Sequence, residues 1–79
     1  MEYYVYVLKS LEKKYIYVGI TENLLRRYTS HQKGYNKTTK PYRPFSIILT
    51  EKFYSRTEAR KREKYLKSGV GKEFLKTLY

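Results

Sequence analysis

Two side chains suited to anion or proton chemistry lie four residues apart in the first half of the chain. Arg27 and His31 have the spacing of neighbours on one side of a helix. Arginine presents a planar fork of donors that matches phosphate oxygens, and histidine can donate or move a proton near neutral pH. The pair therefore predicts either an anion clamp or a solvated basic helix surface, and the sequence leaves both open.

A single carboxylate, Glu63, occupies an unusual position in the second half of the chain. It falls between Ala59 and Leu66, in the apolar stripe of a predicted helix. A carboxylate that faces a core is costly unless it is paired or bound to a metal. The basic neighbours Arg60 and Lys64 make an ion pair the simpler explanation. A metal site stays open, because one carboxylate with several waters commonly holds Mg²⁺ beside phosphates.

Tyrosines recur on both sides of one predicted turn near the start of the chain. The segments Tyr3–Lys9 and Tyr15–Ile20 are rich in β-branched and aromatic residues, and they predict a hairpin that turns about Leu11 and Glu12. One face then carries aliphatic residues, and the other carries tyrosines around a glycine that leaves open space. The pairs predicted by this register are Tyr6 with Tyr17, Leu8 with Tyr15, and Tyr4 with Gly19.

The two faces of this hairpin predict different roles. A functional surface and a second packing layer explain the tyrosine face equally well, since every buried phenol needs a hydrogen-bond partner. We assign Tyr6 and Tyr17 to a site and leave Tyr4 and Tyr15 between site and packing. The aliphatic face is the predicted core and consists of Tyr3, Val5, Val7, Ile16, Val18 and Ile20.

The remaining segments predict the elements that must position these residues. With 79 residues the chain has room for one domain, residues 1–79. The order ββαβαα predicts an α/β domain of the α+β class, with a small three-stranded antiparallel sheet flanked by helices. The further elements expected are a helix capped by Thr21 that runs to Gln32 and stops near Gly34, a long loop over Lys33–Pro44, a strand over Phe45–Phe53, a helix from the capping box Ser55–Glu58 to Lys67, and a terminal helix over Lys72–Leu78.

The charge balance indicates the class of partner. There are 18 Lys and Arg against 7 Asp and Glu, a formal net charge of +11 that suits nucleic acid or an anionic membrane surface. Nucleic acid is favoured, because 11 Tyr and 3 Phe are interleaved with the basic residues and aromatic rings stack on bases. A merely soluble basic protein is the plain alternative. The chain has no cysteine, membrane-length apolar run or signal-peptide pattern, so we expect a soluble cytoplasmic protein.

Taken in order, these segments resemble the GIY-YIG nuclease superfamily. The segment Tyr4-Val5-Tyr6 resembles the GIY element, and Tyr17-Val18-Gly19 resembles the YIG element. The run from Gly19 to Arg27 is similar to the family's segment that ends in its catalytic arginine. The run from Thr57 to Glu63 is similar to the family's helix that ends in its metal-binding glutamate. The likeness covers nearly the whole chain. It is greatest to short stand-alone bacterial proteins related to the incision domain of the UvrC excision-repair nuclease.

The resemblance implies a divalent-metal-dependent endonuclease that hydrolyses DNA phosphodiester bonds in DNA repair or processing, with a single Mg²⁺ or Mn²⁺ ion. It implies that Tyr17 is the general base or orients the attacking water, and that Arg27 stabilises transition-state charge with help from His31. Tyr6 would hydrogen-bond to Tyr17 or to the phosphate, and Glu63 would hold the metal. The residues expected to bind nucleic acid are Gly19, Lys37, Lys40, Tyr42 and Arg43.

Three departures from the family pattern keep other hypotheses open. Tyr4 begins the first element in place of Gly, Ile20 follows YIG where nuclease members often have Lys, and no counterpart of a family Asn follows Glu63. The second hypothesis is therefore a non-catalytic nucleic-acid-binding module that retains the fold, and a protein-interaction adaptor is a third. If the protein is a nuclease, we expect a monomer that acts on DNA, including branched or damaged DNA. We expect no association with a membrane, and the sequence leaves open whether a protein partner takes part.

Overall fold

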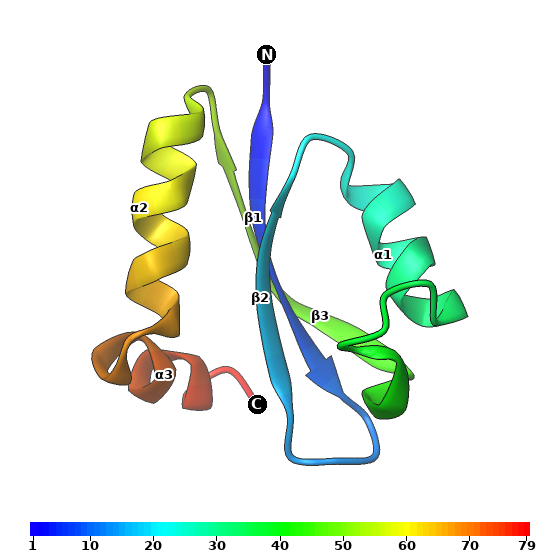
Figure 1. The fold of residues 1–79 in the computed structure, drawn as a ribbon. Coiled ribbons are helices and arrows are strands. Elements are labelled where there is room, and N and C mark those ends of the chain that lie inside the picture. The colour runs from blue at the N-terminus through cyan, green and yellow to red at the C-terminus, as the bar shows by residue number, and fades with distance from the viewer.

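The computed structural model describes residues 1–79 and contains three strands and three α-helices in the order ββαβαα (Figure 1). The predicted α+β fold with a three-stranded antiparallel sheet is confirmed. None of the helices is long and apolar enough to cross a bilayer. The elements are β1 (Tyr3–Ser10), β2 (Ile16–Thr21), α1 (Leu24–Lys33), a short 3₁₀ turn η1 (Lys40–Tyr42), β3 (Phe45–Phe53), α2 (Arg56–Lys67) and α3 (Gly69–Lys76).

The sheet lies between two layers of helix. Its strand order is β2-β1-β3, so β1 is central and β2 and β3 are edges. Figure 1 shows α2 and α3 on one face of the sheet and α1 with η1 on the other. Both faces are therefore covered at the central strand, where the consecutive residues Val5, Tyr6, Val7 and Leu8 are all buried.

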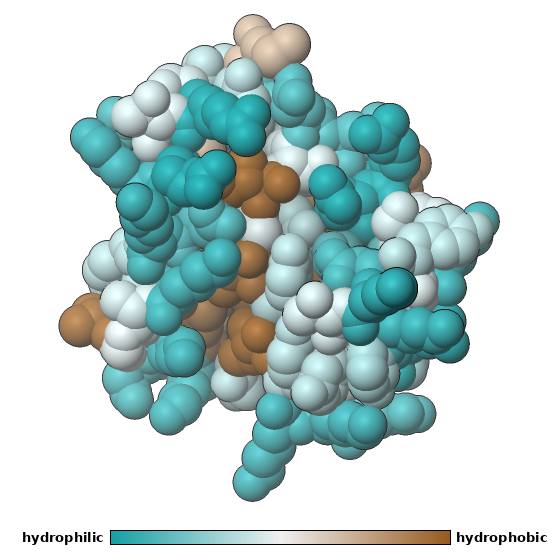
Figure 2. Space-filling view, viewed as in Figure 1, coloured by the Kyte–Doolittle hydropathy of each residue, from teal (hydrophilic) through white to brown (hydrophobic).

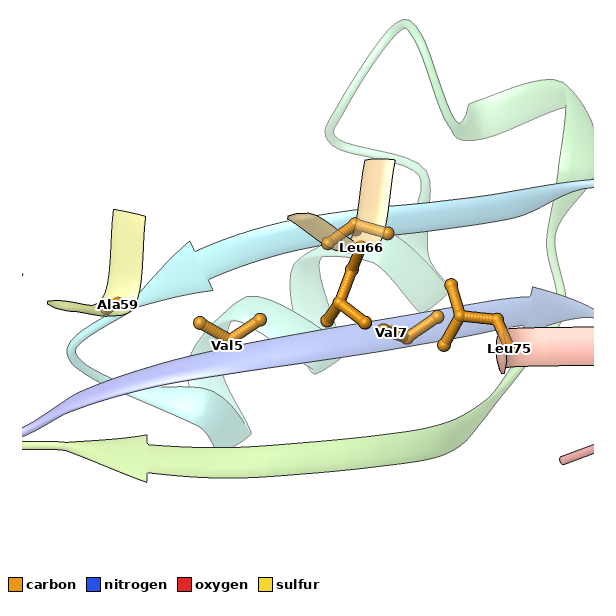
Figure 3. Packing of buried hydrophobic residues seen from close by; sticks show 6 residues of the cluster. Val5, Val7, Ala59, Leu66 and Leu75 are labelled. Carbon is orange, nitrogen blue, oxygen red and sulfur yellow. The ribbon is translucent and has the colours of Figure 1, made fainter. Parts of the chain in front are cut away.

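The aliphatic face of the hairpin forms the main core, as predicted. Val5 and Val7 of β1 are fully buried, and Leu66 of α2 packs over them (Figure 3). Ala59 and Leu75 complete the contact from the same side of the sheet. This packing holds α2, the helix that carries Glu63, against the sheet.

The tyrosine face is a second, smaller core. Tyr6, Leu8 and Phe45 are each almost completely buried and form one cluster. Leu24 and Tyr28 of α1 pack against that cluster from above. Tyr6, which the sequence assigns to a site, is therefore also a packing residue of this face, because its ring is buried.

The predicted hairpin register is wrong by two residues. Tyr6 lies opposite Gly19, and Leu8 lies opposite Tyr17. The turn is centred later than expected, because the Ser10 hydroxyl accepts hydrogen bonds from the backbone N–H groups of two turn residues, Glu12 at 3.3 Å and Lys13 at 3.0 Å. A shift of two residues keeps each side chain on its face, so the sorting of the faces is unchanged.

The space beside Gly19 is filled, which corrects the expectation that this glycine leaves open room. A Cβ atom added at Gly19 would lie 2.6 Å from the Tyr6 hydroxyl oxygen and 2.9 Å from the ring of Tyr17. Real Cβ atoms do not approach other atoms so closely. Gly19 is therefore the residue that lets the phenol of Tyr6 cross over β2 towards α1.

The helix ends differ from prediction at two places. Asn23, not Thr21, caps α1, and its Oδ1 accepts from the Arg26 N–H at 3.0 Å. The Thr21 hydroxyl instead hydrogen-bonds the backbone of Asn23. Helix α3 begins at Gly69, earlier than expected, because Ser68 ends α2 and also caps α3.

Two other predicted helix ends are confirmed. Gly34 follows α1 with φ of 80°, a left-handed conformation that favours glycine. The Ser55 hydroxyl accepts from the Glu58 N–H and opens α2. The local rules of helix capping thus place α2 correctly along the chain.

Replacing Gly19 with alanine tests the close approach of Tyr6. We expect Gly19→Ala to lower the free energy of unfolding by about 1–3 kcal/mol, because the new methyl group must displace a buried ring. Urea unfolding measures the change. Gly69→Ala is the matched control, since a Cβ there meets no atom within 4 Å and alanine suits a helix start. Equal effects at the two positions would contradict the packing described.

Candidate active site

A polar cleft of about 340 Å³ opens beside β2, between the start of α1 and one side of α2. Four predicted site residues line it, although they come from three different elements. Tyr17 and Gly19 lie on β2, Arg27 lies on α1, and Glu63 lies on α2. The fold therefore brings the predicted base, anion clamp and carboxylate to one hollow.

Arginine dominates the lining of this cleft. Arg26, Arg56 and Arg60 line it together with Arg27, whereas its carboxylates are Glu22 and Glu63. The surplus of positive charge in a concave, partly enclosed site favours an anionic ligand. Sequence reasoning missed three of these arginines.

A signal for two of the missed arginines was present in the chain. Arg56, Arg60 and Glu63 follow the spacing i, i+4, i+7 and so share one side of α2. No such signal was present for the third, Arg26. Its place beside the cleft could be inferred only once α1 was known to begin at Leu24.

The carboxylate of Glu63 is only 13% exposed and is paired with two cations. Its Oε1 lies 3.6 Å from Nε of Arg60, and its Oε2 lies 3.2 Å from Nζ of Lys67. The predicted ion pair is therefore present. Both partners are about half exposed, so these contacts are weak and can be exchanged for another cation.

The donors of the cleft restrict how a divalent metal could bind. No group of three or more His, Asp or Glu residues comes together anywhere in the chain. A cage made of protein ligands is thus absent. One carboxylate facing a cleft rich in arginine does fit Mg²⁺ or Mn²⁺, which keep several waters and bind through one or two carboxylates together with phosphate oxygens.

The position of Glu63 depends on a separate ion pair between α2 and the sheet. Arg62 binds Glu51 of β3 in two-pronged fashion, with distances of 2.7 Å from Nε and 3.0 Å from Nη2. The Arg62 guanidinium also lies 5.1 Å from the ring of Tyr65. Paired donors of this kind fix orientation as well as distance, so the rotation of α2 about its axis is restrained.

Tyr6 and His31 lie behind the cleft rather than in it. Tyr6 is 1% exposed and His31 is fully buried, and the Tyr6 hydroxyl is 3.0 Å from Nε2 of His31. Nδ1 of His31 is 2.8 Å from the Thr39 hydroxyl. The Tyr6 hydroxyl thus hydrogen-bonds to the buried His31, a partner that the sequence did not predict, because the pairing with Gly19 leads its ring across β2.

Burial keeps this buried pair neutral near pH 7. Burial, and then the nearby Arg27 guanidinium, lower the pKa of His31 below its usual value. Burial, followed by the neighbouring Tyr17 phenol, raises the pKa of Tyr6. A neutral imidazole has one donor and one acceptor nitrogen, so the chain Tyr6 O–H to Nε2, and Nδ1–H to Thr39, satisfies every polar atom.

Tyr17 connects the buried pair with the cleft. Its ring centroid is 4.9 Å from that of His31 and 6.1 Å from that of Tyr6, while the residue stays partly exposed and lines the cleft. Packing against two buried rings restricts the orientation of Tyr17. The buried pair of Tyr6 and His31 therefore supports a residue that lines the cleft.

The loop residues expected to bind nucleic acid lie outside the cleft. Tyr42 stacks on Tyr15 with centroids 3.8 Å apart, so Tyr15 is a packing residue. Arg43 donates from Nη1 to the Lys33 carbonyl at 3.1 Å, near the end of α1. The other two, Lys37 and Lys40, are exposed.

The sequence of this chain is similar to a known family of protein domains. A model of the GIY-YIG catalytic domain matches residues 2–76. The UPF0213 protein lmo0166 of Listeria monocytogenes is 44% identical over 63 residues, which cover 78% of this chain and 69% of the relative. The UPF0213 protein SH2523 of Staphylococcus haemolyticus is 33% identical over 78 residues, which cover 98% of this chain and 94% of the relative.

A solved structure has a similar fold. The solution NMR structure of the UPF0213 protein BH0048 from Bacillus halodurans aligns with a TM-score of 0.60 at 34% sequence identity. The alignment covers 99% of this chain and 85% of that one. The likeness therefore extends over both layers of helix as well as the sheet.

The pKa of His31 predicts how stability depends on pH. Because the folded pKa lies below the unfolded value of about 6.5, the unfolded chain binds the proton more tightly as pH falls. We expect the free energy of unfolding to fall below about pH 6.5, with a slope of up to about 1.4 kcal/mol per pH unit until the folded pKa is reached.

Urea titrations over this pH range measure the dependence, and His31 is the one histidine in the chain. His31→Gln is the control, because it removes the titrating group while keeping hydrogen-bonding capacity. We expect this variant to lose the extra slope. An imidazole that titrates at or above its ordinary value in NMR spectra of the folded protein would refute the prediction.

Proposed function

The chain belongs to the GIY-YIG family, and we propose that it is a divalent-metal-dependent endonuclease that hydrolyses phosphodiester bonds of DNA. The observation that carries the proposal is the convergence of Tyr17, Arg27 and Glu63 from three elements on one arginine-rich cleft. The net charge of +11 supports a polyanionic substrate. Its cellular role would be in DNA repair or processing.

The proposed reaction is the attack of water on a phosphorus atom of the DNA backbone. The new bond joins the water oxygen to phosphorus, and the bond from phosphorus to one deoxyribose oxygen breaks. One product strand then ends in a phosphate and the other in a hydroxyl, which takes up a proton. Tyr17 would orient the water or accept its proton, and its ring packing supports that role because the orientation is restricted.

Arg27 would stabilise the charge that develops on the phosphate oxygens. It is exposed in the cleft and takes part in no ion pair, so its guanidinium fork is available to a phosphate. The neighbouring arginines of α1 and α2 would hold the flanking backbone.

Glu63 would hold the metal, with water and phosphate oxygens as the other ligands. A bound metal would neutralise the negative charge that develops in the reaction. The contacts of Glu63 with Arg60 and Lys67 hold the carboxylate in place, and they are weak enough to be exchanged for a bound cation.

Tyr6 and His31 act as positioning residues in this proposal. Both are buried, so neither reaches a phosphate in the cleft. Their hydrogen bond instead holds the rings that pack against Tyr17. The assistance expected from His31 would thus be indirect.

A second candidate function is a nucleic-acid-binding module without catalysis. The paired state of Glu63 favours it, as does Ile20, which stands where a lysine is common and packs against the apolar core. This candidate predicts salt-sensitive DNA binding and no metal-dependent cleavage.

Metal-dependent cleavage tests the nuclease directly. We expect nicking of plasmid and branched DNA in Mg²⁺ or Mn²⁺, and its loss in EDTA. Tyr17→Phe and Glu63→Gln should each lower the rate by roughly 100-fold or more, because each removes one group needed at the reacting phosphate. Nicking that survives both substitutions would exclude this cleft, and DNA binding without nicking would favour the second candidate.

Arg27→Gln separates catalysis from general attraction to DNA. We expect it to lower kcat by roughly 100-fold with a smaller change in KM, since Arg27 acts on transition-state charge. Arg43→Gln is the control of equal charge change, because Arg43 lies outside the cleft. Similar kcat values for the two variants would argue against a catalytic role of Arg27.

A further inference from the structure

A second hollow lies beside the other half of β2. It has a volume of about 510 Å³ and is bordered by β2, α2, α3 and the end of the chain. Its floor is apolar, with Ile16 and Val18 of β2 and Leu75 of α3. Figure 2 shows apolar residues along the middle of the molecule, beside the α2 and α3 side of the view in Figure 1. We call this hollow the β2 groove.

The β2 groove adjoins the polar cleft. Tyr17 lines both hollows and is the one residue that they share. The six residues of β2 span roughly 20 Å, and the two hollows follow one another along this strand. A ligand that places one group in the cleft and the next group in the β2 groove must therefore pass Tyr17.

The rim of the β2 groove is strongly basic. Lys14, Lys67, Lys72 and Lys76 line it, and no carboxylate does. An apolar floor with a cationic rim matches a nucleotide, which combines a flat apolar base with an anionic phosphate. Its volume is within the range of roughly 300–1,000 Å³ found for small-molecule sites.

A second copy of the chain fits this groove poorly. A two-fold contact places the same surface patch against itself, so the four lysines of each copy would face those of the other. A DNA strand, in contrast, brings phosphates to the same lysines and is already expected in the adjoining cleft.

We propose that the β2 groove binds an unpaired nucleobase adjacent to the scissile phosphate, so that the enzyme selects DNA in which paired and unpaired segments meet. This inference rests on the proposed nuclease function and names its substrate class. A base inside a duplex is stacked and paired, so only an unpaired nucleotide can enter the groove without the cost of unpairing. Tyr79, an exposed aromatic residue of the groove, offers a stacking surface.

The first test measures binding without metal, in EDTA. The probes are a short DNA duplex with one unpaired 2-aminopurine and the same duplex with that base paired. We expect tighter binding of the unpaired probe and a change in its fluorescence. Tyr79→Ala should weaken that binding by roughly tenfold, because an aromatic stacking partner is lost. Tyr54→Ala is the matched control, since both tyrosines are exposed with a lysine over the ring and Tyr54 lines neither hollow.

The second test uses paired charge changes. Lys72→Gln with Lys76→Gln should lower the dependence of log affinity on log salt by about 1.4 to 1.8 for the unpaired probe, as two phosphate contacts near a junction of paired and unpaired DNA are removed. Lys61→Gln with Lys64→Gln is the control on α2. Each double variant removes two exposed lysines, of which one takes part in an i,i+3 ion pair with glutamate.

The outcomes distinguish failure of the groove proposal from failure of the proposed nuclease function. Equal binding of the paired and unpaired probes, or equal effects of the groove and control variants, would overturn the groove proposal while cleavage by the native protein still supports the nuclease. Sedimentation that shows a native dimer and a monomeric Tyr79→Ala variant would also overturn it, by assigning the groove to a second copy. A protein that neither binds nor cuts either probe would refute both proposals.

Discussion

The hydrogen-bonded series of Tyr6, His31 and Thr39 is the interaction on which the site depends. It begins on the central strand, passes through α1 and ends in the loop before β3. Because the sheet is covered on both faces, each polar atom on the inner side of α1 needs a partner within the protein. These three residues meet that need, and at the same time they fix the distance between α1 and the sheet.

The other wall of the cleft is held by different means. Helix α2 packs on the aliphatic face through Ala59 and Leu66, and the pairing of Arg62 with Glu51 restrains its rotation. Apolar burial gives most of the stabilising free energy, but it is non-directional. The two-pronged ion pair adds direction, so Glu63 and the arginines of α2 face the cleft.

The sequence predicted the elements and the two faces of the hairpin, because both follow from local spacing. Its register could not be predicted, since it depends on whether the Ser10 hydroxyl captures the turn N–H groups. The convergence of Tyr17, Arg27 and Glu63 followed from the family resemblance, whereas the partnership of Tyr6 with His31 required the placement of α1 over Gly19. Contacts across distant segments depend on packing that no local pattern encodes.

Ser68 has a mechanical consequence for the two hollows. Its hydroxyl donates to the Tyr65 carbonyl at the end of α2 and accepts from the Gly71 N–H at the start of α3, so no flexible residue separates the helices. The close fit of Gly71 against Leu66 stiffens the same corner. The α3 wall of the β2 groove is therefore positioned directly by the end of α2, the same helix that carries Glu63. The shape of the groove and the position of the carboxylate thus depend on the same corner between two helices.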